Sequence, residues 1–157
     1  MGQFTFLRSY ILTEGDHISN KKKHSFNRLN DNDINNAELR MNIKLPEELI
    51  QFFKEIGYGF MSNKTKQGIN RLMDPSSIVD FRLGESVYEN DPDRVIYDND
   101  KLLVFFEVSE GTYLTMDFTN VSRNDEEQCP IYYFDEKIAD SLYEFLVRMD
   151  SGTDYFI

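Results

Sequence analysis

Cysteine is almost absent from this chain of 157 residues. The single cysteine, Cys129, has no internal partner for a disulfide, so nothing suggests an oxidising compartment, and we expect a cytoplasmic protein. The same scarcity excludes a cysteine-rich zinc site. The two histidines, His17 and His24, stand in polar sequence without ligands at zinc-binding spacing, and we expect both to be exposed on a loop. The sequence therefore predicts no metal and no other cofactor.

Long apolar runs are missing as well. No window approaches the roughly 18 apolar residues that a membrane helix requires. Residues 1–17 lack the basic start and the sustained apolar run of a secretory signal. The sequence therefore predicts neither a signal peptide nor a membrane anchor.

Basic residues are scarce in the second half of the chain. The formal net charge is −11, and residues 74–157 hold 6 Lys and Arg against 20 Asp and Glu. A surface of that sign repels nucleic acid, so we expect no direct nucleic-acid binding, whereas it would attract a basic protein. The alternative is that these carboxylates only keep one face of the molecule hydrated.

Aromatic residues are plentiful, although tryptophan is absent. Thirteen Phe and nine Tyr, within a hydrophobic fraction of 40 %, separate the chain from disordered acidic sequences and can fill one core. We expect a single domain over residues 1–157, with residues 1–33 as a loop-rich lead-in.

The lead-in has a weak pattern of its own. Its apolar residues at even spacing fit an edge strand or a strap held by aromatics, and the polar residues 13–36 are expected to form a loop. The evenly spaced residues are Phe4, Phe6, Tyr10 and Leu12.

Three segments have the pattern of helices. The clearest covers residues 46–56, where Pro46 suits the first helical position and Gly57 follows as a stop. Another is predicted over residues 34–40, and a third begins at Asp74-Pro75 and ends at Gly84. The clearest helix has an apolar stripe of Leu49, Phe52, Phe53 and Ile56.

The period changes to that of strands later in the chain. Runs at residues 102–108 and 112–118 predict a hairpin, and a further strand is predicted over residues 131–134. Asp135 is expected to cap a final helix. The buried stripe of that helix would consist of Ile138, Leu142, Phe145, Leu146 and Met149. The fold class is therefore α+β, with N-terminal helices, a central, largely antiparallel sheet and a C-terminal amphipathic helix.

Catalytic residues are not evident in the sequence. Cys129 follows an acidic turn, where neighbouring carboxylates disfavour the thiolate. The segment Asp31-Asn32-Asp33 is similar to the opening of a calcium loop, but Asn36 stands where that loop needs glycine. Because no set of residues joins a nucleophile, a base and a group that stabilises charge, we expect no enzymatic activity.

An acidic stretch is the main candidate site. Its carboxylates have three interpretations: a cation site or an acid–base pair, a surface that binds a basic protein with tyrosines as contact anchors, or plain solvated surface. Irregular spacing and the lack of a basic companion count against the first. The candidate partner-binding residues are Tyr88, Glu89, Asp91, Asp93, Tyr97, Asp98, Asp100 and Glu107.

Five segments follow one another at a recognisable spacing. The most distinctive is residues 45–59, a helical LP-x-x-L-x-x-F phrase followed by glycine. The others are residues 34–39, 70–77, 105–114 and 138–146. In this order and spacing they resemble the SUKH superfamily, which includes yeast cell-wall-assembly regulators and bacterial immunity proteins.

The resemblance implies the same α+β fold and a role in binding instead of catalysis. Many bacterial relatives bind and neutralise a toxin, often a nuclease. We therefore expect an immunity protein that binds a cognate basic toxin, a nuclease, stoichiometrically through the acidic stretch. The alternative is a regulatory or scaffold module of the same fold that binds an endogenous protein or a small ligand. The oligomeric state stays open.

Overall fold

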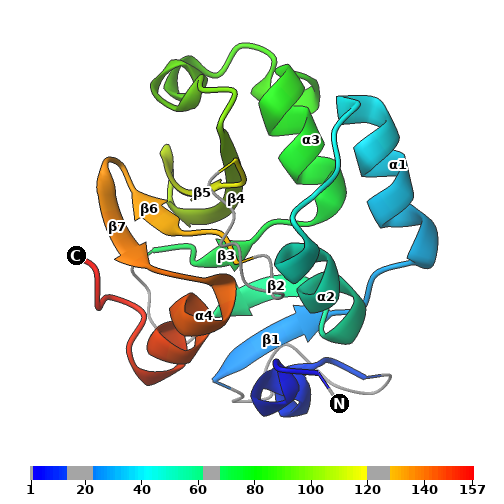
Figure 1. Ribbon diagram of the computed structural model, residues 1–157, viewed down its shortest axis with the longest axis vertical. Coiled ribbons are helices and arrows are strands. Elements are labelled where there is room, and N and C mark those ends of the chain that lie inside the picture. Colours follow the sequence, from blue (N-terminus) through cyan, green and yellow to red (C-terminus); the bar gives the residue numbers. More distant parts are fainter. Residues whose placement is uncertain (1, 14–22, 62–67, 120–127) are drawn as a thin grey trace.

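The computed structural model describes residues 2–13, 23–61, 68–119 and 128–157. Within these ranges the chain forms one antiparallel sheet of seven strands with helices packed against it (Figure 1). The strands follow one another across the sheet in chain order, so each pairs with its neighbours in the sequence. The predicted α+β class, with an antiparallel sheet and a C-terminal helix, is confirmed.

The elements are short, and the longest strand has 8 residues. The strands are β1 (His24–Asn27), β2 (Tyr58–Met61), β3 (Arg71–Leu72), β4 (Leu102–Ser109), β5 (Thr112–Asp117), β6 (Ile131–Tyr133) and β7 (Glu136–Ala139). The α-helices are α1 (Asp31–Met41), α2 (Glu47–Glu55), α3 (Pro75–Leu83) and α4 (Leu142–Ser151). The 3₁₀ helices are η1 (Thr5–Tyr10), η2 (Ser86–Tyr88) and η3 (Pro92–Tyr97).

Most of the predicted elements are present where the sequence indicates them. α1 and α2 confirm the helices expected over residues 34–40 and 46–56, and β4 and β5 form the expected hairpin. α3 follows Asp74, whose side chain accepts a hydrogen bond from the backbone N–H of Ser77. Gly84 ends α3 with a φ of 69°, a left-handed conformation that glycine adopts readily.

The N-terminal lead-in is more ordered than the sequence indicates. Instead of an edge strand, the chain forms η1, because the spacing of three residues lets Phe4 and Leu7 both reach the core. The loop expected over residues 13–36 is wrong where the structure describes it, since β1 pairs with β2 and α1 begins at Asp31. β1 has only four residues and lies in polar sequence, so its alternation of apolar and polar residues is too short to predict a strand.

His24 is not an exposed loop residue. It lies in β1 with a buried side chain that packs against the ring of Tyr10. Its Nε2 lies 2.8 Å from Oδ1 of Asp150 in α4. Burial lowers the pKa of His24, and the contact with Asp150 opposes this shift only in part. The other histidine, His17, lies outside the described residues.

The predicted start of the C-terminal helix is also wrong. Asp135 lies in the turn between β6 and β7, and α4 begins only after Ser141, whose side chain accepts a hydrogen bond from the N–H of Glu144. Ile138 belongs to β7, where it is buried. Its spacing of four residues from Leu142 imitates a helix, although the two side chains reach the core from different elements.

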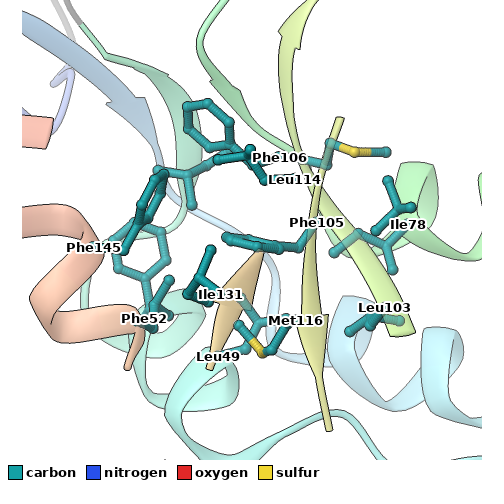
Figure 2. Close-up of a cluster of buried hydrophobic side chains, with 14 of the residues drawn as sticks. Leu49, Phe52, Ile78, Leu103, Phe105, Phe106, Leu114, Met116, Ile131 and Phe145 are labelled. Carbon is teal, nitrogen blue, oxygen red and sulfur yellow. The ribbon is translucent and has the colours of Figure 1, made fainter. Parts of the chain in front are cut away.

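The hydrophobic core lies between the sheet and the helices, and Figure 2 shows large side chains of both converging there. The ring centroid of Phe145 in α4 lies 5.9 Å from that of Phe105 and 5.2 Å from that of Phe106, both in β4. Both contacts are edge-to-face, the geometry that aromatic pairs favour. Phe52 of α2 is fully buried as well. The two predicted apolar stripes therefore face one core.

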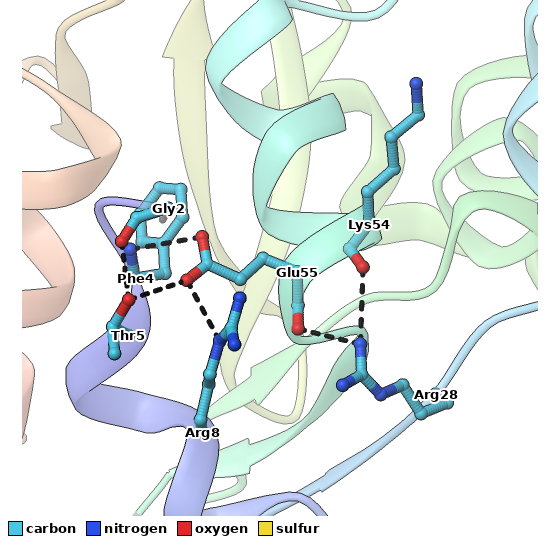
Figure 3. A network of polar contacts seen from close by, with 7 residues as sticks. All are labelled: Gly2, Phe4, Thr5, Arg8, Arg28, Lys54 and Glu55. Carbon is cyan, nitrogen blue, oxygen red and sulfur yellow. Dashed lines mark hydrogen bonds and ion pairs between the residues drawn. The ribbon is translucent and has the colours of Figure 1, made fainter.

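A carboxylate on α2 holds the N-terminal segment in place (Figure 3). Glu55 accepts hydrogen bonds from the backbone N–H of Phe4 (3.3 Å) and the hydroxyl of Thr5 (3.2 Å), and it forms an ion pair with Arg8 (3.3 Å). The backbone carbonyl of Glu55 accepts a further hydrogen bond (2.8 Å) from Arg28, which lies between β1 and α1. These polar contacts of Glu55 add to the packing of Phe4 and Leu7 in the core.

A second carboxylate joins two helices inside the core. Glu48 in the first turn of α2 is 2 % exposed. Its two oxygens accept hydrogen bonds from the backbone N–H groups of Leu142 (2.7 Å) and Tyr143 (3.0 Å). These are unsatisfied donors at the start of α4, so Glu48 caps a helix 94 residues away in the sequence.

Candidate partner-binding surface

Residues 85–100, which we call the acidic loop, connect α3 to β4 and contain η2 and η3. In Figure 1 this loop forms the upper end of the molecule, beyond α3. It carries six Asp and Glu side chains and one basic residue, Arg94. Seven of the eight candidate residues lie in it, and the eighth, Glu107, lies in β4.

Hydrogen bonds attach the acidic loop firmly to α3. Arg94 donates from Nε to the carbonyl of Phe81 (2.6 Å) and from Nη2 to the carbonyl of Arg82 (3.1 Å). Arg82 in turn donates to the carbonyls of Asp100 (3.2 Å) and Leu102 (3.1 Å). Arg94 thus donates to backbone carbonyls at the C-terminal end of α3, and its role is to stabilise the fold.

The two candidate tyrosines point inward. Tyr88 and Tyr97 are each only 7 % exposed, and both pack against Phe81 of α3. The hydroxyl of Tyr97 accepts a hydrogen bond from the backbone N–H of Tyr113 (2.9 Å), and that of Tyr88 accepts one from Arg71 (3.3 Å). Burial raises the pKa of both phenols. The tyrosines therefore support the loop from below, and the expectation that they offer contact area is corrected.

The candidate carboxylates fall into three groups. Glu107 faces Arg71 of β3 at 3.2 Å, and its side chain is 16 % exposed, so its charge is neutralised within the fold. Asp91 and Asp93 are partly exposed; Asp91 accepts a hydrogen bond from the N–H of Asp93 at the start of η3. The remaining three are exposed on the loop: Glu89, Asp98 and Asp100.

Aliphatic side chains also stand exposed on the acidic loop. Val87 is 83 % exposed, Val95 78 % and Ile96 61 %. Phe134, in the turn between β6 and β7, stacks on Tyr97 with 6.3 Å between ring centroids and is 47 % exposed. Sequence reasoning missed these four residues, although branched aliphatic residues within an Asp-rich segment were a visible signal.

Two further features of the described residues bear on function. None of the helices in the described ranges is long and apolar enough to cross a membrane. Across the same ranges, no three or more His, Cys, Asp or Glu side chains are grouped so that they could hold a metal ion.

The sequence of the chain is similar to those of known proteins. The chain is 40 % identical over 143 residues to a protein named Immunity protein YxxD from Bacillus subtilis (strain 168), covering 89 % of this chain and 92 % of that protein. No solved structure is significantly similar to this chain. The pattern of the SUKH_6 family, described as SMI1-KNR4 cell-wall, matches residues 31–146. This match covers α1, α2 and α3, strands β2 to β7, the acidic loop and the first half of α4, and so the chain belongs to the SUKH_6 family of the SMI1-KNR4 group.

Proposed function

We propose that this protein is an immunity protein that binds and neutralises a cognate toxin, without catalysis of its own. The observation that carries the proposal is the 40 % identity, over 89 % of the chain, to a protein named as an immunity protein. Family membership supports it, because the match includes the whole acidic loop. Neutralisation would then occur in the cytoplasm of the producing cell, by a stoichiometric complex.

We further propose that the toxin is a nuclease. A nuclease must hold a polyanion with Lys and Arg side chains. A folded surface with exposed carboxylates can occupy the same basic groove and exclude the substrate. The exposed charge of the acidic loop supports this proposal, and within the loop Glu89, Asp91, Asp93, Asp98 and Asp100 would face the toxin. Tyr88, Tyr97 and Glu107 would hold the loop in shape.

The proposal is tested with the product of the toxin-like gene that we expect next to this one in the native genome. Calorimetric titration of that polypeptide with this protein should give a stoichiometry near one. Cleavage of DNA and RNA by the polypeptide should cease at one molar equivalent.

Three results would count against the proposal in different ways. Absence of binding would reject the immunity role and leave the regulatory or scaffold alternative. Inactivation at far less than one equivalent would indicate catalysis. Binding to a toxin that cleaves neither nucleic acid would retain the immunity role and reject the nuclease.

A further inference from the structure

The exposed aliphatic residues of the acidic loop bury little of their surface in the fold. Val87, Val95 and Ile96 are mostly solvent-exposed, whereas Tyr88 and Tyr97, their neighbours in the sequence, fill the core beneath. Removing apolar surface from water is favourable, so three branched side chains left in water on one short segment form a ready contact for a partner.

The loop that carries them is preorganised. Arg94 ties η3 to the carbonyl end of α3, and Tyr97 is held by the N–H of Tyr113. Asp93 lies against the turn between β4 and β5, where a Cβ added to Gly111 would stand 2.7 Å from its Oδ2. A partner that docks on these side chains would therefore lose little affinity to ordering the loop.

Carboxylates flank the aliphatic residues along the acidic loop. Of the six on the loop, Glu85 is paired with Arg40 at 2.7 Å. The other five have no basic side chain of the loop to neutralise them, since Arg94 binds backbone carbonyls. Asp135 in the β6–β7 turn and Glu136 at the start of β7 are exposed and follow Phe134, which stacks on Tyr97. An apolar centre within a polar rim is the usual composition of a protein interface.

We propose that Val87, Val95 and Ile96 are the apolar centre of the docking surface for the cognate toxin, and that the occupant is a basic face of that toxin with an apolar depression at its middle. This inference rests on the proposed immunity function. Charge complementarity selects the occupant, because the carboxylates around the centre need cations opposite them. The carboxylates set the rate of encounter, and the aliphatic side chains set the lifetime of the complex.

The test replaces aliphatic side chains without changing the charge. Val95→Ser combined with Ile96→Ser should raise the dissociation rate of the complex with the neighbouring toxin at least about ten-fold and leave the association rate within about two-fold. The loss should persist in 0.5 M NaCl, since apolar contacts are not screened by salt. Val87→Ser, measured alone, should give a smaller loss of the same kind. Binding is followed by biolayer interferometry, with circular dichroism melts to show that each variant is folded.

Two matched controls lie outside the acidic loop. Leu39 in α1 is 78 % exposed and Ile157 is 79 % exposed, close to the value for Val95. Leu39→Ser and Ile157→Ser should leave both rate constants unchanged. Losses of equal size in the controls, or unchanged dissociation of folded Val95→Ser/Ile96→Ser while the wild type binds tightly, would overturn the inference and retain the immunity role. A wild-type protein that does not bind the toxin would overturn both.

Discussion

At the scale of single residues, Glu48 shows how a charge can belong to a hydrophobic core. Its side chain is buried, and its carboxylate accepts hydrogen bonds from the first backbone N–H groups of α4. A buried carboxylate is tolerated only when such donors replace its lost hydration. The side chain thus fixes where α4 begins relative to α2.

Changing Glu48→Gln should therefore destabilise the protein. The amide keeps one acceptor oxygen but places an NH₂ group against the second N–H, which leaves a buried donor unsatisfied. Urea melts should show a loss of about 1–3 kcal/mol in the free energy of unfolding. Glu47→Gln is the matched control, because Glu47 is exposed in the same helical turn, and it should change stability by less than about 0.5 kcal/mol. Equal effects of the two variants would show that the buried cap contributes nothing.

The buried histidine gives the protein a dependence on pH. Because burial lowers the pKa of His24 in the folded state, the unfolded chain takes up a proton that the folded chain does not. The contribution of His24 to the free energy of unfolding is complete above about pH 6.5, which is the ordinary pKa of histidine. This contribution is lost as the pH falls below that value, because the unfolded chain is then protonated first. Asp150 acts at lower pH: burial alone would raise its pKa, but hydrogen bonds from His24 and Lys23 lower it.

Urea melts at intervals between pH 7.5 and 5 should show this loss, and His24→Gln should flatten the curve in that interval. At pH 7.5 the His24→Gln variant should be no more stable than the wild type. The informative quantity is therefore the slope of the free energy of unfolding against pH. His17→Gln controls for the other histidine. A slope that His24→Gln leaves unchanged would contradict the assignment.

At the scale of elements, α4 joins the sheet to the N-terminal half of the chain. Phe145 packs edge-to-face on two phenylalanines of β4, while Glu48 of α2 caps the same helix. Tyr143 also contacts the ring of Phe6 in η1, with 5.9 Å between centroids. One helix of ten residues therefore meets the sheet, α2 and the start of the chain.

Phe145→Ala should cost on the order of 3–5 kcal/mol in urea melts, because it leaves a cavity among rings that cannot close around it. Val147→Ala on the exposed face of α4 provides the comparison and should cost less than about 1 kcal/mol. A loss below about 1 kcal/mol for Phe145→Ala would contradict its central place in the core.

The elements that the sequence predicts well are those with a long, repeated signal. α2 combines an apolar stripe with Pro46 before it and Gly57 after it, and the structure confirms it. β1 has only four residues in polar sequence, and its burial depends on pairing with β2. The sequence predicts helix where β7 lies, because Ile138 and Leu142 are four residues apart, the spacing of one helical turn. The structure ends β7 at Ala139 and begins α4 only after Ser141.

Only part of the candidate site can likewise be predicted from the sequence. Its carboxylates could be found by composition, because charge is a local property of the sequence. The burial of Tyr97 could not, since it depends on Tyr113 and Phe81, which only the fold brings beside it. The ion pair between Glu107 and Arg71 joins two strands and was hidden for the same reason.

At the scale of the whole molecule, charge and apolar exposure coincide at one end. The second half of the chain carries 20 of the 28 acidic residues, and the acidic loop holds six of them together with exposed Val87, Val95 and Ile96. A net charge of −11 would attract any basic protein weakly, whereas a local cluster on a fixed loop directs the approach. The central claim is that this loop steers and receives the toxin.

The most direct measurement compares two variants of equal net charge. Asp98→Asn with Asp100→Asn removes two charges from the acidic loop, and Asp31→Asn with Glu47→Gln removes two exposed charges elsewhere, so both change the net charge from −11 to −9. Association rates with the neighbouring toxin are measured by stopped-flow between 0.02 and 0.5 M NaCl. The loop variant should associate roughly three-fold or more slowly at low salt, the other variant should match the wild type within about 1.5-fold, and the difference should vanish at high salt. Equal rates for the two folded variants would contradict the claim, because net charge alone would then account for the attraction.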